Sequence, residues 1–72
     1  MLKVRDFLAQ LDEGEHLTLI DAIGAGLHDA SMAALCLTDP GPQAEHVAQL
    51  LAYLTRAIGS LEAARDVVRR HA

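Results

Sequence analysis

Cysteine and aromatic residues are scarce in this sequence of 72 residues. Cys36 is the single cysteine, which excludes an intramolecular disulfide, and one Phe, one Tyr and no Trp leave few large side chains for a core. A domain of this size buries only about 60% of the surface that its unfolded chain exposes, and small domains usually compensate with disulfides, a metal or self-association. We therefore expect residues 1–72 to form one helical domain that assembles with a second copy.

Long apolar runs are missing as well. The longest extends from Met32 to Leu37, far short of the ~20 residues that a membrane-spanning helix needs. Residues 1–6 lack the apolar segment and the small-residue cleavage site of a secretory signal. Together with one free thiol, these features predict a cytoplasmic protein without a membrane partner.

Basic residues are absent from the middle of the chain. Residues 6 to 55 hold eight Asp and Glu but no Lys or Arg, although the net charge of the whole chain is only −4. A surface of one sign repels nucleic acid and attracts a basic partner. We therefore predict that Asp29, Asp39 and Glu45 are exposed near the hairpin turn and contact another protein, which has a basic surface.

Alanine and leucine are abundant, and they lead the scale of helix propensity. Two prolines and a glycine within residues 38–43 end one helix, and the second proline suits the first turn of the next. We predict helices at about 2–12, 19–37 and 42–71. Since the first two together match the third in length, the fold class is all-α, a helical hairpin with a short N-terminal helix.

Local signals refine the second helix. Thr18 followed by Asp21 is typical of a capping box, so we expect this helix to begin at about Leu19. Gly24 and Gly26 cost a helix roughly 1 kcal/mol each relative to alanine. With the alanines around them they form a strip of small residues, which favours tight packing against another backbone.

Apolar residues recur at spacings of three and four on both long helices, as in packed helix pairs. The predicted seam of the second helix comprises Ile20, Ile23, Leu27, Ala30, Ala34 and Leu37. The predicted stripe of the third comprises Val47, Leu50, Leu51, Leu54, Ala57, Ile58, Leu61, Ala64 and Val68.

A further apolar patch of Met32, Leu35 and Cys36 projects away from the predicted seam. One partner helix cannot cover both the seam and this patch, so something else must bury the patch. We expect it to form either the homodimer interface of a four-helix-bundle-like assembly or a contact site for a different protein.

Catalytic, metal and cofactor signatures do not occur in the sequence. The four histidines and Cys36 show none of the spacings that zinc sites use. Cys36 lies in an apolar stretch without a basic neighbour that would activate its thiol, which favours a structural cysteine. No nucleophile context and no glycine-rich phosphate loop is present. We expect neither enzymatic activity nor a cofactor.

Two functions remain open from the sequence. The first is a non-catalytic protein–protein interaction module, a small adaptor, regulator or inhibitor that acts as a homodimeric helical hairpin. One candidate target of this module is a nucleic-acid-binding protein. The alternative is a small RNA- or DNA-binding regulator, because arginines gather in the last third of the chain and contact phosphates readily. The candidate phosphate contacts are Arg56, Arg65, Arg69 and Arg70.

Overall fold

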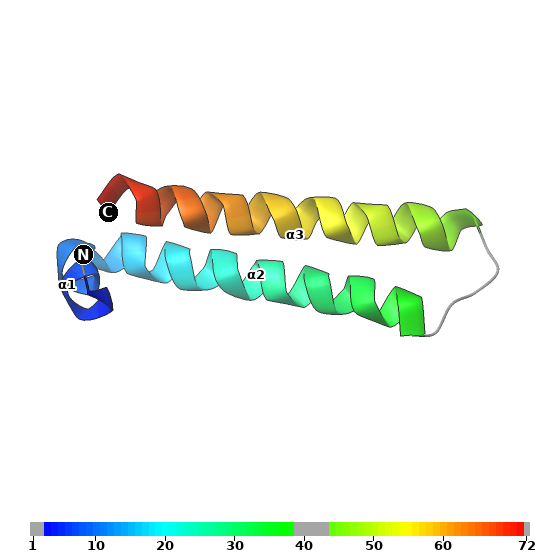
Figure 1. Ribbon diagram of the computed structural model, residues 1–72, viewed down its shortest axis with the longest axis horizontal. Coiled ribbons are helices and arrows are strands. Elements are labelled where there is room, and N and C mark those ends of the chain that lie inside the picture. The colour runs from blue at the N-terminus through cyan, green and yellow to red at the C-terminus, as the bar shows by residue number, and fades with distance from the viewer. Residues whose placement is uncertain (1–2, 39–43, 72) are drawn as a thin grey trace.

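The computed structural model describes residues 3–38 and 44–71, and of residues 44–46 the backbone alone. It contains α1 (Val4–Gln10), α2 (Glu13–Thr38) and α3 (Ala44–His71). All described residues except three are helical. Helices α2 and α3 run antiparallel side by side, and α1 lies across the end where α2 begins and α3 ends (Figure 1). The prediction of an all-α hairpin is confirmed.

Helix α2 begins six residues earlier than predicted, because a different capping box starts it. The backbone N–H of Glu15 donates to Oδ1 of Asp12 at 2.7 Å, and the N–H of Asp12 donates to Oε1 of Glu15 at 3.2 Å. These reciprocal bonds satisfy two of the N–H groups that a helix start leaves free. The capping box predicted at Thr18 is wrong, since Thr18 lies inside the helix.

The seam between α2 and α3 consists mainly of small residues, with Leu19 and Val67 at the end where α2 begins and α3 ends. On α2 the buried residues are Leu19, Gly26 and Ala33. On α3 they are Ala57, Ala64 and Val67. The spacings of seven and three keep each set on one line along its helix, as in antiparallel helix pairs.

The predicted seam is wrong by one residue. Ile20 and Leu27 directly follow the buried residues Leu19 and Gly26, and Ile23 follows the partly buried Ala22. All three are exposed in the single hairpin. On α3, Ala57 and Ala64 of the predicted stripe do pack against α2, whereas Leu54, Ile58 and Leu61 are exposed. The contact therefore uses the small residues, and the large ones lie beside it.

Gly26 of α2 lies directly against the side chain of Leu61 on α3. A Cβ atom built on Gly26 would lie 2.7 Å from Cγ and Cδ2 of Leu61 and 3.5 Å from the carbonyl oxygen of Ala57. Real Cβ atoms do not approach a carbon that closely, so any larger residue requires Leu61 to move. Gly24, in contrast, has nothing within 4 Å of its would-be Cβ.

These two glycines give a matched test of the seam. Gly24→Ala should raise the free energy of unfolding by about 0.5–1 kcal/mol, because alanine favours a helix over glycine. Gly26→Ala should lower it by about 1 kcal/mol, since overpacking outweighs the same gain in helix propensity. Urea melts of both variants measure the difference. Equal stabilisation by both would mean that the side chain of Leu61 moves aside without cost, and would contradict tight packing at Gly26.

The open end of the hairpin, where α2 begins and α3 ends, is closed by α1. Phe7 and Leu11 pack against the cluster of Leu19, Ala64 and Val67. The ring of Phe7 meets the ring of His71 edge to face, with centroids 6.0 Å apart and planes at 72°. Nε2 of His71 lies 3.0 Å from Oε2 of Glu15, a residue that already takes part in the capping box.

The Glu15–His71 contact predicts that the stability of the hairpin depends on pH. The hydrogen bond from His71, followed by the backbone bond from Asp12, holds the pKa of Glu15 below its usual value of 4.5. A carboxyl with a lowered pKa in the folded state stabilises above its unfolded pKa, and this contribution is lost as the pH falls through the folded value.

We therefore expect Glu15→Gln to destabilise the hairpin at about pH 5.5 and to differ less and less from the parent toward about pH 3. Denaturant melts across this range measure the difference. Glu13→Gln is the control, since Glu13 belongs to the same helix turn. A Glu15→Gln effect independent of pH would contradict the assignment.

Helix α2 is also long and apolar enough, by length and composition, to cross a membrane. That test is passed equally by core helices of soluble proteins and by signal sequences, and 17% of the most apolar window is buried against the rest of the chain. The longest apolar run did not predict this result, because the mean hydropathy is raised by leucines, isoleucines and alanines spread between the polar residues of the helix. The cytoplasmic location stays a prediction.

Candidate interaction surface

Most of the exposed large residues of α2 and α3 lie on the same side of the hairpin, and Leu35 is an exception. Each α-helical residue is rotated by about 100° from the one before it. On two antiparallel helices that face each other, the positions that follow the seam positions turn toward the same side. The stripe next to the seam on α2 therefore adjoins the corresponding stripe on α3.

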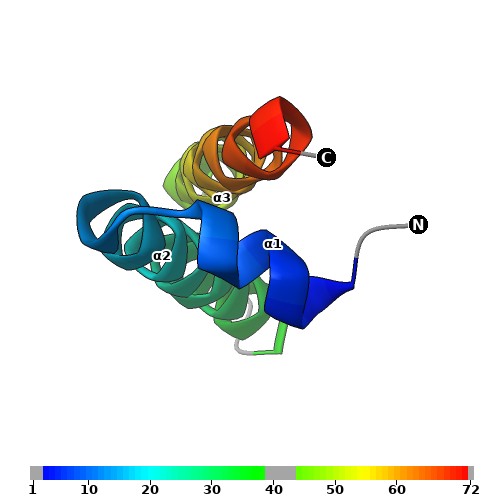
Figure 2. The same ribbon diagram turned by 90° about the vertical axis from the view of Figure 1, so that its left-hand side faces the viewer.

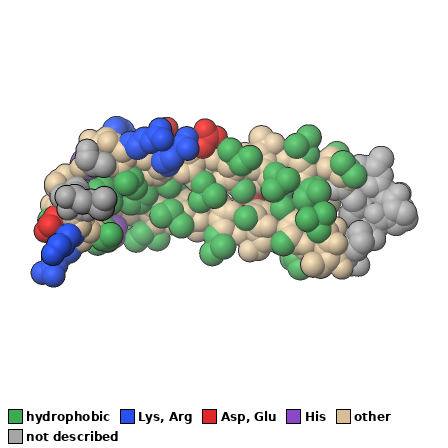
Figure 3. All heavy atoms as spheres, viewed as in Figure 1, with side chains coloured by type: hydrophobic (Ala, Val, Ile, Leu, Met, Phe, Trp, Pro, Cys, Tyr) green, Lys and Arg blue, Asp and Glu red, His purple; other side chains and the backbone are tan. Residues whose placement is uncertain are grey.

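Together these two stripes form what we name the apolar face. Figure 3 shows hydrophobic side chains gathered on this side, over both long helices. The large exposed members are Ile20, Ile23, Leu27 and Leu37 from α2, and Val47, Leu51, Leu54, Ile58, Leu61 and Val68 from α3. Leu27 and Leu51 keep 66% and 64% of their surface exposed.

The molecule is too thin to hide this face by itself. Its dimensions are 49 × 22 × 16 Å, and its radius of gyration is 15.6 Å, whereas a compact chain of this length has about 11 Å. No side chain among residues 3–38 and 47–71 is fully buried. The accessible surface is 5402 Å², and a compact 7.7 kDa monomer exposes about 4,300 Å².

Charges border the apolar face at the open end. Nη2 of Arg65 lies 3.7 Å from Oε2 of Glu62, one turn earlier on α3, and both side chains are 55% exposed. These two residues line a shallow pocket with Ile58 and Leu61. An exposed pair of this kind contributes little to stability, but it gives the open end of the face a polar edge.

The predicted patch of Met32, Leu35 and Cys36 turns out to be smaller than the apolar face. Met32 and Cys36 are half-buried in the single hairpin, and Leu35 is 57% exposed. The side chains that need a second partner are mainly those of the predicted seam. Sequence spacing had located them, but it assigned them to the contact between α2 and α3.

Of the predicted acidic contact residues, the structure describes the side chain of Asp29 alone. Asp29 is half-buried rather than exposed. Asp39 lies outside the described residues, and of Glu45 only the backbone, in the first turn of α3, is described. Acidic residues also occupy the open end, through α1 and the capping box.

The four candidate arginines are divided between two sides of α3. At 100° per residue, Arg56 and Arg70 share one side, and Arg65 and Arg69 share the other. The guanidinium of Arg56 lies 5.0 Å from the ring centroid of Tyr53, which is a cation–π contact. The structure therefore does not bring these residues together into one basic patch.

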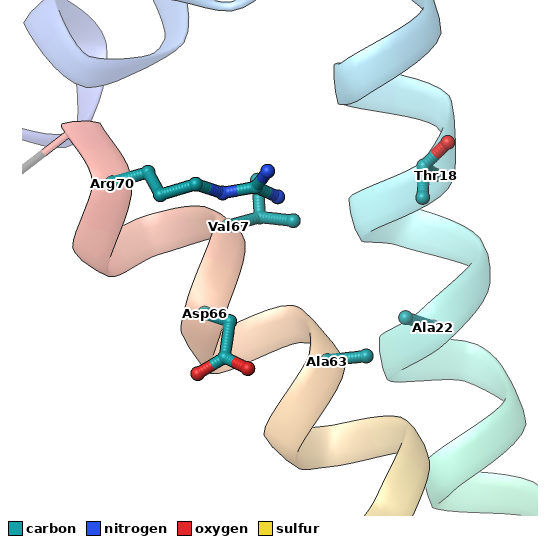
Figure 4. Close-up of a pocket in the computed structure, with 6 residues that line it drawn as sticks. All are labelled: Thr18, Ala22, Ala63, Asp66, Val67 and Arg70. Carbon is teal, nitrogen blue, oxygen red and sulfur yellow. The ribbon is translucent and has the colours of Figure 1, made fainter.

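A second hollow lies on the side opposite the apolar face, near the open end. This pocket of 510 Å³ is lined by Thr18 and Ala22 of α2 and by Ala63, Asp66, Val67 and Arg70 of α3. The side chain of Arg70 extends toward α2 across the pocket (Figure 4). Its walls are short side chains, which leave it open to solvent. No group of three or more His, Cys, Asp or Glu within the described residues could hold a metal ion.

Comparison with known proteins returned no match: no family model, no curated protein and no solved structure is similar to this chain. The functional argument therefore depends on the surface of the molecule itself.

Leu54 reports whether the apolar face is covered in solution. Its side chain is 41% exposed in the single hairpin, so Leu54→Ala should cost about 2–5 kcal/mol if a partner buries it and distinctly less if the face stays in water. Arg56→Ala is the control and should change stability by no more than about 0.5 kcal/mol. Denaturant melts at several protein concentrations distinguish the cases.

Proposed function

We propose that this chain is a non-catalytic protein–protein interaction module, which acts as a homodimeric helical hairpin in the role of a small adaptor, regulator or inhibitor. The observation that carries the proposal is the apolar face, which extends along both long helices. An exposed apolar patch of this extent on a small protein marks an interaction site.

The exposed area supports a second copy as the first partner. The surface of this chain exceeds that of a compact monomer by roughly 1,100 Å². A standard interface covers about 800 Å² on each partner. Two hairpins stacked on their apolar faces would place the large side chains between two helix layers, which is the core of a four-helix bundle.

The seam explains why dimerisation would complete the fold. Alanine and glycine bury little apolar surface, so the contact between α2 and α3 contributes less than a core of leucine and isoleucine does. The largest hydrophobic contribution then arises between copies, and the stability of such a protein depends on its concentration.

The outer surface of the dimer would meet the target of the module. We propose a protein with a basic surface, because the net charge of the chain is −4 and residues 6–55 carry no Lys or Arg. Association with such a target is faster at low salt, since long-range attraction steers the encounter.

Binding to RNA or DNA is the second candidate. The arginines of α3 favour it, but they occupy two sides of the helix, and Arg65 is next to Glu62. A gel shift that weakens steeply with salt and is lost on replacing Arg65, Arg69 and Arg70 would put this function first.

One pair of substitutions tests the proposed surface. Leu51→Glu places a charge on the apolar face, and Leu35→Glu places the same charge on the opposite side, where the leucine is similarly exposed. Neither change touches the buried seam, so both variants should stay helical. Sedimentation equilibrium should show a dimer for the parent and Leu35→Glu, and a monomer for Leu51→Glu. The reverse pattern would locate the interface at Met32, Leu35 and Cys36.

A further inference from the structure

Helix α1 lies on the same side of the hairpin as the apolar face. Figure 2 views the molecule from the open end, with the side displayed in Figures 1 and 3 turned to the right, and α1 lies to the right of the start of α2. Its packing against Leu19, Ala64 and Val67 holds it there. The short helix therefore limits the apolar face at one end and leaves the other end open.

Two of the four residues in the apolar stripe of the N-terminal segment do not pack against the hairpin. Val4, Phe7, Leu8 and Leu11 share one side of this helix by their spacing of three and four. Phe7 and Leu11 pack against the hairpin. Val4 remains 73% exposed and Leu8 is exposed as well, beside a face that already needs covering.

We infer that the second copy lies antiparallel on the apolar face, so that each α1 meets the tip of the partner hairpin, the end formed by Leu37 and Val47. This orientation rests on the proposed function, because it requires that two copies meet through the apolar faces. It assigns a role to α1, which sets the direction and the register of the dimer.

Steric arguments favour the antiparallel over the parallel arrangement. Packed helices lie about 8–10 Å apart, and one helix with its side chains is about 10–12 Å thick. With both open ends together, two copies of α1 would have to share the space between the hairpins at one end. The long helices would then be held apart and their apolar faces would stay wet.

Antiparallel stacking places one α1 at each end of the bundle. The apolar faces can then meet along the length between the two short helices. Val4 and Leu8 gain an apolar neighbour, since the exposed leucine and valine at the partner's tip lie at that end.

Spin-label distances test the orientation. The free cysteine is first removed by Cys36→Ser, and a spin label is then attached to a new cysteine. A label at the exposed position Glu13→Cys marks the open end of the hairpin. A label at the exposed position Ala25→Cys marks the middle of α2, on the side opposite the apolar face. Residue 13 lies about 15 residues, or ~23 Å, from the middle of the apolar face on α2, so two labels should be about 45 Å apart along an antiparallel dimer. The label at residue 25 is the control, because its distance depends little on orientation.

Substitutions in α1 test the contact that sets this orientation. Val4→Glu adds a charge to the exposed apolar stripe, at the start of the helix where an acid is tolerated. Ala9→Glu adds the same charge to the outer side of α1. Val4→Glu should weaken self-association about tenfold or more, which is the loss of one buried valine contact. Ala9→Glu should leave it unchanged.

The outcomes separate this inference from the proposed function. A dimer with long distances at residue 13 and a specific Val4→Glu effect supports both. A dimer in which the two labels at residue 13 lie close together overturns the antiparallel orientation. The same holds for a dimer whose self-association is unchanged by both Val4→Glu and Ala9→Glu. In either case the proposed function as an interaction module is unaffected. A parent chain that stays monomeric at about 100 μM, well above the Kd of a stable dimer, overturns both.

Discussion

The close approach of α2 and α3 at Gly26 is the constraint on which the rest of this molecule depends. Gly26 leaves room for the side chain of Leu61, and a Cβ atom at this position would lie in ordinary van der Waals contact with the carbonyl oxygen of Ala57. Alanines at neighbouring positions along the seam extend this contact in both directions. The two helices are joined by dispersion contacts between short side chains, each small and collectively sufficient to set the geometry.

This geometry has a consequence for the large side chains. When alanine and glycine occupy the contact, the leucines and isoleucines that follow them by one position are turned to the side of the pair rather than into it. The hairpin is then a slab one helix thick, with a dry seam and an apolar face. A structure of this kind has its second layer outside the chain, which is why we propose self-association as the first step of its function.

At the open end of the hairpin, polar and aromatic contacts join the three helices. Asp12 and Glu15 cap α2, Glu15 also contacts His71, and the ring of Phe7 lies against that histidine. A carboxylate, an imidazole and an aromatic ring thus connect all three helices at one end. The same contacts hold α1 beside the apolar face, where a helix of seven residues can direct how a second copy approaches.

Much of this architecture follows from the sequence alone. Helix propensity, the prolines after Thr38 and the spacing of three and four are local properties, so they predicted a helical hairpin with a short first helix. The start of α2 was missed because Asp12 with Glu15 and Thr18 with Asp21 both match a capping pattern. Only the first pair has the apolar cluster of α1 beside it.

The choice between adjacent stripes was decided by the tertiary structure. On α2 the line through Leu19, Gly26 and Ala33 and the line through Ile20 and Leu27 have the same period, so periodicity cannot rank them. Ranking by hydrophobicity selected the larger residues for the seam between α2 and α3. The structure places the smaller ones there, because packing depends on how closely two surfaces fit as well as on how apolar they are. The sequence determined the helices and their apolar sides, and the fit between two backbones decided which side faces inward.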